Sequence, residues 1–132
     1  MLLNFLRGFR FEQLVNGALL TIGLDGSDML VLVLSLLAGE DMYGYQMIVE
    51  LGRRSNRTFE MKEGTLYPVL HGLEKDGYVE AYQQEAPTGR VRKYYHLTRK
   101  GGAALKTEEK AWETYSGAVN AVLRSSAGLN LA

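Results

Sequence analysis

The chain contains 132 residues, 46% of them hydrophobic, and its 15 basic residues balance its 15 acidic ones. This length is typical of one globular domain, which buries roughly two thirds of its unfolded surface. The absence of cysteine excludes disulfides, thiolate metal ligands and a cysteine nucleophile, and it is typical of a reducing, cytoplasmic setting. Because the sequence has two histidines, a multi-histidine metal site would need both of them, and we expect neither a metal ion nor another cofactor.

The first 24 residues predict an amphipathic helical extension. Apolar side chains recur there at the spacing of one helix face, and they are Leu14, Val15, Ala18, Leu19 and Ile22. We expect this extension to pack on its own domain or on a partner subunit, and binding to a membrane surface is the alternative. The longest apolar run, residues 29–38, is interrupted at Ser35 and has ten residues. Since about 20 are needed to span a bilayer, no membrane-spanning helix is predicted.

Three further helices are expected after this extension. The first covers residues 29–38, follows the N-cap candidate Ser27 and is apolar on nearly all sides, which indicates burial. The second covers about residues 43–55, after a turn in which Asp41 is a possible cap. The third covers about residues 62–75, and its buried stripe consists of Leu66, Val69, Leu70 and Leu73.

A β-hairpin and a long helix complete the predicted order of elements. Residues 78–85 and 90–97 are strand-like, and the Ala86-Pro87-Thr88-Gly89 segment between them has the composition of a tight turn. Thr98 is a good N-cap for a helix that reaches about residue 123. Three helices followed by a hairpin are the order of a winged helix-turn-helix, so we expect a mainly α fold with a small β-hairpin wing.

The neutral total charge is the sum of segments with opposite charge. Residues 25–52 carry five acidic and no basic side chains. Residues 53–75 carry five basic against three acidic side chains, and residues 85–100 carry five against one. In a winged helix-turn-helix, the third helix enters the major groove of DNA and the hairpin reaches the flanking backbone. The positive charge therefore falls on the two elements that would contact DNA.

We expect DNA contacts from the helix of residues 62–75 and from the hairpin. Basic side chains beside a Thr-Gly turn suit phosphate contacts, and a glycine near a helix start lets the backbone approach a phosphate. The alternative for each is an ordinary solvated surface residue, and Tyr67 could belong in part to the core. The candidate DNA-contacting residues are Lys62, Gly64, Thr65, Tyr67, His71, Thr88, Gly89, Arg90, Arg92 and Lys93.

The last helix carries a seam with seven-residue spacing. It consists of Leu105, Trp112 and Val119, with Glu108, Tyr115 and Val122 at the companion positions. A seam of this kind on a terminal helix needs a partner, so we expect these six residues to form the contact of a homodimer.

Four segments occur together in an order that matches a known family. They are Tyr43-Gly44-Tyr45, Gly64-Thr65-Leu66-Tyr67-Pro68-Val69-Leu70, Leu73-Glu74-Lys75-Asp76-Gly77 and Arg92-Lys93-Tyr94-Tyr95-His96-Leu97-Thr98, with Gly101 shortly after. Together they span about residues 29–122. On these segments the sequence resembles the PadR-like family of bacterial transcriptional regulators, in particular its short members with a single C-terminal helix.

The resemblance implies a homodimeric winged-helix repressor whose C-terminal helix and N-terminal region form the dimer contacts. In drug-binding members of this type, a tryptophan of the C-terminal helix lines a pore at the dimer centre and stacks on planar aromatic compounds. Trp112, near Tyr115, matches that position, and the alternative is that it only fills the dimer seam. The chain departs from the family where Lys62 and Glu63 replace a frequent Ser-Pro pair and where the N-terminal stretch is longer.

The sequence thus supports two functions as hypotheses. The first is a homodimeric repressor that binds an inverted repeat in double-stranded DNA and is released by a small planar aromatic ligand. The second is a winged-helix module for protein association, and a peripheral membrane protein is a remote third. No phosphate-binding loop, paired acidic motif or Ser-His-Asp arrangement is evident, so we expect no enzyme activity. The expected parts are an extension (1–24), a DNA-binding domain (26–97), a dimerisation helix (98–124) and a flexible tail (125–132).

Overall fold

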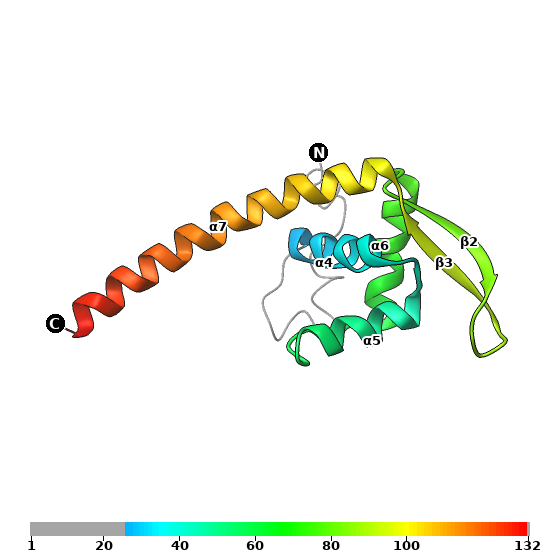
Figure 1. The fold of residues 1–132 in the computed structure, drawn as a ribbon, viewed down its shortest axis with the longest axis horizontal. Coiled ribbons are helices and arrows are strands. Elements are labelled where there is room, and N and C mark those ends of the chain that lie inside the picture. Colours follow the sequence, from blue (N-terminus) through cyan, green and yellow to red (C-terminus); the bar gives the residue numbers. More distant parts are fainter. Residues whose placement is uncertain (1–25, 132) are drawn as a thin grey trace.

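A computed structural model describes the backbone of residues 26–131 and the side chains of residues 29–125. Along this part of the chain the elements follow in the order α4, β1, α5, α6, β2, β3, α7. Figure 1 shows a head built from the first six elements and a long helix, α7, that crosses the head and extends far beyond it. The predicted mainly α fold with a β-hairpin is confirmed. The helix predicted for residues 1–24 lies outside the described residues.

The first helix, α4 (Gly26–Gly39), forms the centre of the core. It contacts α7, α5 and β3, so it is enclosed from several sides, as its apolar composition predicts. Its fully buried side chains are Met29, Leu30, Val33 and Leu34. Because α4 begins at Gly26, Ser27 lies inside its first turn and is not the N-cap.

The helix-turn-helix consists of α5 (Gly44–Arg54) and α6 (Glu63–Lys75). Each helix contributes one apolar stripe to the common core, formed by Met47, Leu51, Leu66, Val69, Leu70 and Leu73. After α6, Gly77 has a φ of 80°, a left-handed conformation that favours glycine. The N–H of Tyr78 then donates to the carbonyl of Leu73 at 2.9 Å, which closes the helix end in the way the glycine predicts.

The sheet has three antiparallel strands in the order β1-β3-β2. The predicted hairpin is formed by β2 (Val79–Glu85) and β3 (Val91–Leu97). The segment predicted as a simple turn before α5 instead contains a third strand, β1 (Met42–Tyr43), which pairs with Tyr95 and Tyr94 of β3. This strand connects the hairpin to the start of α5, so the hairpin is not joined to the head through α6 alone.

The long helix α7 (Arg99–Leu131) is fixed to the end of α6 by its first turn. Thr98 is the N-cap that the sequence predicts, because its Oγ1 accepts a hydrogen bond from the Gly101 N–H at 3.0 Å. The same hydroxyl donates to the carbonyl of Gly77 at 2.7 Å, and Lys100 Nζ donates to the carbonyl of Asp76 at 2.8 Å. We call these contacts the α6–α7 junction.

The far end of α7 differs from the prediction. The sequence indicates a helix end near residue 123 and a flexible tail from residue 125, whereas α7 continues to Leu131. No proline follows Thr98, and the alanine and leucine residues near the C-terminus favour a helix, which accounts for the difference. Within the described part of the chain, no helix combines the length and the apolar character needed to cross a membrane.

Candidate nucleic-acid interface

One face of α6 is exposed along its whole length. Its members lie opposite the buried stripe, and they are Gly64, Tyr67, Pro68, His71 and Lys75; Lys62, the exposed residue before the helix, is its N-cap. The prediction that Thr65 contacts DNA is corrected, since this residue is buried with 6% of its surface exposed. Thr65 lies one helical turn before Val69 and therefore belongs to the inner face.

Gly44, the first residue of α5, makes room for the side chain of Tyr67. A Cβ atom at position 44 would lie 2.8 Å from Cζ of Tyr67, closer than such atoms approach one another. The ring of Tyr67 therefore rests against the backbone of α5, while 42% of the residue stays exposed. Tyr67 therefore packs in the junction of the two helices and also belongs to the exposed face of α6. From the sequence, either position is possible for this side chain.

The basic residues of β3 point to both faces of the sheet. Side chains alternate along a strand, so Arg92 lies on the face of β3 that carries Tyr94, and Lys93 lies on the face that carries Tyr95. Arg92 and Lys93, both expected to contact DNA phosphates, thus point to opposite faces of the sheet. The turn residues Thr88 and Gly89 are exposed, as is Arg90.

Arg92 is held on an aromatic surface. Its Cζ lies 5.4 Å from the centre of the Tyr43 ring, which meets the Tyr94 ring edge-on at 5.4 Å. Tyr82 stacks on the other side of Tyr94, with ring centres 5.8 Å apart. The half-buried guanidinium gains a cation–π contact, and its Nε has no hydrogen-bond partner within the described residues. The contact with Tyr43 therefore favours one orientation of the side chain.

Lys93 lies between the hairpin and α6. Its Nζ is 3.6 Å from Oε1 of Glu74 and 5.6 Å from the centre of the Tyr95 ring. Glu74 is seven residues after Tyr67, so both belong to the edge of α6 that faces β3. Burial raises the pKa of Tyr95, whose hydroxyl lies in the same region. This ion pair joins the hairpin to α6.

A polar cluster of Asp41, Tyr82 and His96 lies on the face of the sheet that also carries Tyr94. The Tyr82 hydroxyl donates to Asp41 Oδ2 at 2.6 Å, and His96 Nδ1 lies 2.8 Å from Asp41 Oδ1. Burial alone would raise the pKa of Asp41, but hydrogen bonds from Tyr82 and His96 and the charge of His96 outweigh it and lower the pKa. The same hydrogen bond, with burial, raises the pKa of Tyr82 to about 12. Asp41 is not a helix cap, since it ties β1 to both strands of the hairpin.

This cluster predicts a loss of stability in acid. A carboxylate whose pKa is lower in the folded state than its ordinary 3.8 stabilises the fold above that pH, and the stabilisation disappears as the pH falls through the folded-state value. Urea unfolding between pH 6 and about pH 3 should therefore show a steeper fall for the wild type than for Asp41→Asn. Glu109→Gln, an exposed change on α7, should follow the wild type. Equal slopes for the wild type and Asp41→Asn would contradict the assignment.

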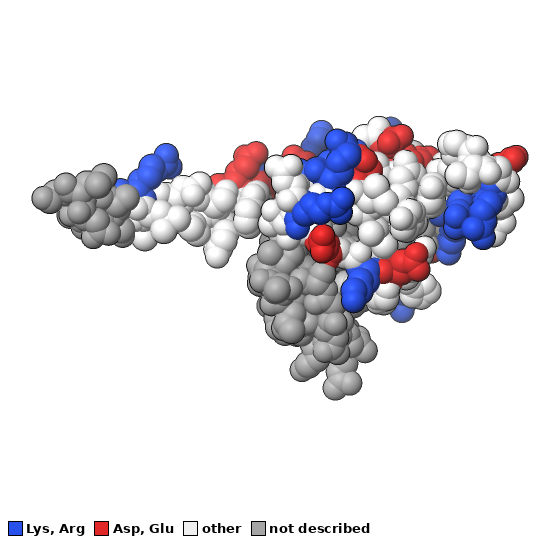
Figure 2. All heavy atoms as spheres, turned by 90° about the horizontal axis from the view of Figure 1, so that it is seen from below, with Lys and Arg blue, Asp and Glu red and all other residues white. Residues whose placement is uncertain are grey.

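The hairpin carries three of the basic residues of the head, Arg90, Arg92 and Lys93. Figure 2 shows a dense group of basic side chains at the hairpin end of the molecule. Near the end of α5, by contrast, Arg53 and Arg54 both bind Glu50, each through Nε at 2.9 Å. Their hydrogen bonds lower the pKa of Glu50 to about 2, so this carboxylate stays charged and offsets part of their positive charge.

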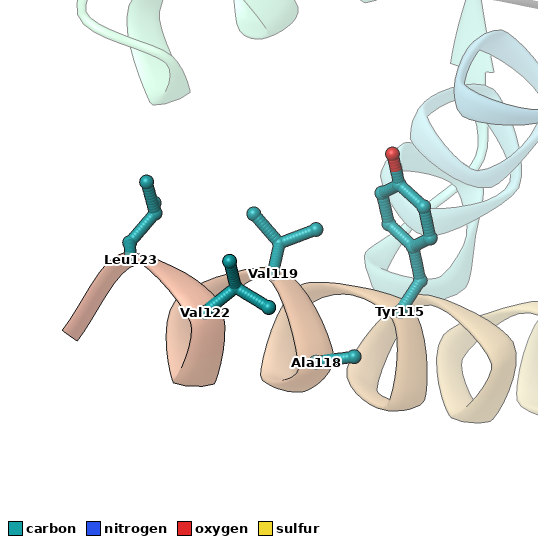
Figure 3. Close-up of a pocket in the computed structure, with 5 residues that line it drawn as sticks. All are labelled: Tyr115, Ala118, Val119, Val122 and Leu123. Carbon is teal, nitrogen blue, oxygen red and sulfur yellow. The ribbon is translucent and has the colours of Figure 1, made fainter. Parts of the chain in front are cut away.

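The exposed part of α7 carries an apolar stripe. Its large side chains are between 39% and 66% exposed, and they are Trp112, Tyr115, Val119, Val122 and Leu123. Tyr115, Ala118, Val119, Val122 and Leu123 line a shallow groove of about 330 Å³ (Figure 3). Trp112 lies next to this groove, with its ring centre 5.9 Å from that of Tyr115.

The predicted dimer seam is shorter than the sequence indicates. Leu105 is 5% exposed and belongs to the core of its own subunit, where α7 contacts α4, so it is corrected to a core residue. Glu108 is half-buried. The exposed large side chains of the seam begin at Trp112.

A helix-turn-helix followed by a hairpin with basic side chains defines a winged helix-turn-helix DNA-binding protein. Residues 33–107 match the transcriptional regulator PadR-like family, and the chain belongs to this family. It is 37% identical over 81 residues to the transcriptional regulator Rv3488 of Mycobacterium tuberculosis. The aligned segment covers 61% of this chain and 72% of that protein. The protein is thus a DNA-binding transcriptional regulator, and its family is one of regulators and not of enzymes.

Solved structures agree with this assignment. A PadR-like transcriptional regulator from Bacillus cereus is 32% identical and superposes with a TM-score of 0.66, over 72% of this chain and 90% of that one. A PadR family transcription regulator from Clostridium difficile is 31% identical, with a TM-score of 0.62, over 72% of this chain and 97% of that one. The winged-helix architecture is therefore shared with proteins of the same family.

Proposed function

We propose that the protein is a homodimeric repressor that binds an inverted repeat in double-stranded DNA and is released by a small planar aromatic ligand. The observation that carries the proposal is the exposed face of α6 together with a hairpin that carries the basic side chains of Arg90, Arg92 and Lys93. Residues 26–97 would form the DNA-binding domain, and residues 98–124 would form the dimerisation helix. Binding to chromosomal DNA would place the protein in the cytoplasm.

The proposed DNA contacts come from two elements. The exposed face of α6 would enter the major groove, and the hairpin would contact the phosphates beside it. The oriented guanidinium of Arg92 suits a phosphate, because little side-chain freedom is lost when it binds. Because Thr65 is buried, it is not among the proposed contacts. These are Lys62, Gly64, Tyr67, His71, Thr88, Gly89, Arg90, Arg92 and Lys93.

The proposed dimer rests on the apolar stripe of α7. Large apolar side chains on a helix that projects from the head would be covered by the same stripe of a second copy. A two-fold dimer reads an inverted repeat, whose half-sites would lie one helical turn or roughly 34 to 36 Å apart.

The proposed ligand site is the groove of α7 together with Trp112. Tyr115 and Trp112 offer aromatic faces on which a planar aromatic compound can stack. A ligand that binds one spacing of the two subunits better than the other would shift the dimer away from the DNA-binding state. Quenching of Trp112 emission by planar aromatic cations is the direct measurement, and a flat titration favours a role in dimer packing only.

The DNA-binding proposal is tested by fluorescence anisotropy with a duplex from the region upstream of the gene. Each phosphate contact contributes about 0.9 to the slope of log affinity against log salt concentration. Arg90→Ala together with Arg92→Ala should weaken binding to all sequences and lower this slope by about 1.8. Lys106→Ala with Lys110→Ala, the same change of charge on exposed positions of α7, should leave the slope unchanged.

Two outcomes would contradict the proposal. Affinity that does not depend on salt would exclude phosphate contacts, and an unchanged slope in the double arginine variant would exclude the hairpin from the interface. The absence of DNA binding would favour the second function, a winged-helix module for protein association. Repression is tested with a reporter fused to the region upstream of the gene. If the protein is a repressor, the reporter should be expressed more strongly when the gene is deleted.

A further inference from the structure

The starting observation is the position of Lys93 among the basic residues of the hairpin. Arg92 faces the aromatic surface of Tyr43, whereas Lys93 points to α6 and meets Glu74 at 3.6 Å. Lys93 therefore lies where the hairpin meets the last turn of α6, at the edge of the surface that would face DNA. The positive charge of Lys93 is already paired with the carboxylate of Glu74 in the same chain.

Glu74 is placed where helix electrostatics disfavour it. It belongs to the last turn of α6, where the exposed carbonyl groups carry partial negative charge and basic side chains are preferred. A glutamate there does not stabilise α6 through the helix dipole. The cross-element contact with Lys93 is the interaction that accounts for a carboxylate at this position.

The ion pair is also accessible enough to be exchanged. The side chains of Lys93 and Glu74 are 53% and 37% exposed. Pairs between exposed side chains stabilise a protein by about 0 to 1 kcal/mol and are screened by salt. A DNA phosphate can therefore replace the carboxylate of Glu74 on Lys93, at the cost of the ion pair.

We propose that Glu74 occupies Lys93 in the free protein and competes with DNA phosphate for it, so that Glu74 lowers the affinity for DNA of any sequence. The inference rests on the proposed DNA contacts of the hairpin. Lys93 contributes little to counterion release as long as Glu74 neutralises it. Glu74 thus restrains the sequence-independent part of binding, which is almost wholly electrostatic.

The test is a double-mutant cycle measured by anisotropy with a duplex of unrelated sequence. Glu74→Gln should raise affinity several-fold at low salt and steepen the salt slope by about 0.9, because Lys93 is released. In a Lys93→Gln background, Glu74→Gln should change neither affinity nor slope appreciably. A gain that persists without Lys93 would show general repulsion by Glu74, and no gain in the single variant would show no competition; either result overturns the proposal.

A second measurement separates this proposal from the DNA-binding function. On phosphocellulose, Glu74→Gln should elute at higher salt than Glu109→Gln, which makes the same charge change on exposed α7. Equal elution of the two variants overturns the competition even if the protein binds no DNA. If the wild type binds DNA in a salt-dependent way and Glu74→Gln does not differ from it, the proposed function stands and the competition fails.

Discussion

Replacing Val119 with aspartate is expected to separate the proposed dimer into monomers and to lower affinity for an inverted repeat by roughly 100-fold or more. Val119 lies in the middle of the exposed stripe of α7 and lines its groove. A carboxylate buried there without a partner would oppose association strongly. Each half-site would then be bound separately, and the gain from simultaneous binding of both would be lost.

The matched control is Ala121→Asp. Ala121 is exposed on the same turns of α7 but two residues away from Val119, on the opposite side of the helix. This variant adds the same charge and should remain a dimer with unchanged DNA affinity. Sedimentation or light scattering measures the assembly state. A dimeric Val119→Asp protein would show that the stripe is not the dimer interface.

Two neighbouring glycines at the start of α7 should respond to alanine in opposite directions. A Cβ atom at Gly101 would lie 3.0 Å from the backbone carbon of Tyr78 and 2.7 Å from Cδ1 of Leu97, and it would meet the Tyr78 carbonyl oxygen even more closely. Because backbone cannot yield as a flexible side chain does, Gly101→Ala should lower the free energy of unfolding by about 2 to 3 kcal/mol.

Gly102 is the internal control. The nearest atom to a Cβ there is Cδ2 of Leu97 at 4.0 Å, an ordinary contact distance. Gly102→Ala should therefore raise the free energy of unfolding by about 0.5 to 1 kcal/mol, as alanine does inside a helix. Urea unfolding of the two variants measures both effects. Equal effects would contradict the close approach of α7 to Tyr78.

Elements with a strong local pattern could be predicted from the sequence. The apolar spacing of α6, the Thr98 cap and the turn between β2 and β3 each depend on residues close together in the chain, and the structure contains all three. Strand β1 could not be predicted in this way. Its two residues form a strand only because β3, about 50 positions later, pairs with them.

The errors at the candidate site have a similar origin. Thr65 lies one turn before Val69 on the buried side, but its polar side chain suggests the surface. Leu105 has the spacing of the dimer seam, and spacing does not distinguish a partner helix from α4 of the same subunit. Side chains alternate between the two faces of a strand, so the sequence could have placed Arg92 and Lys93 on opposite faces of β3. The link from Asp41 to Tyr82 and His96 spans 41 and 55 positions and has no local signal.

The α6–α7 junction makes the orientation of α6 depend on the direction of the long helix α7. Because Thr98 and Lys100 bind carbonyls at the end of α6, the two helices should turn together. A helix of 33 residues, the length of α7, is about 50 Å long. A tilt of about 5° at one end therefore moves the other by roughly 4 Å. In the proposed dimer, the angle at which the two α7 helices cross would set the distance between the two α6 helices. This distance would determine which spacing of half-sites the protein can bind.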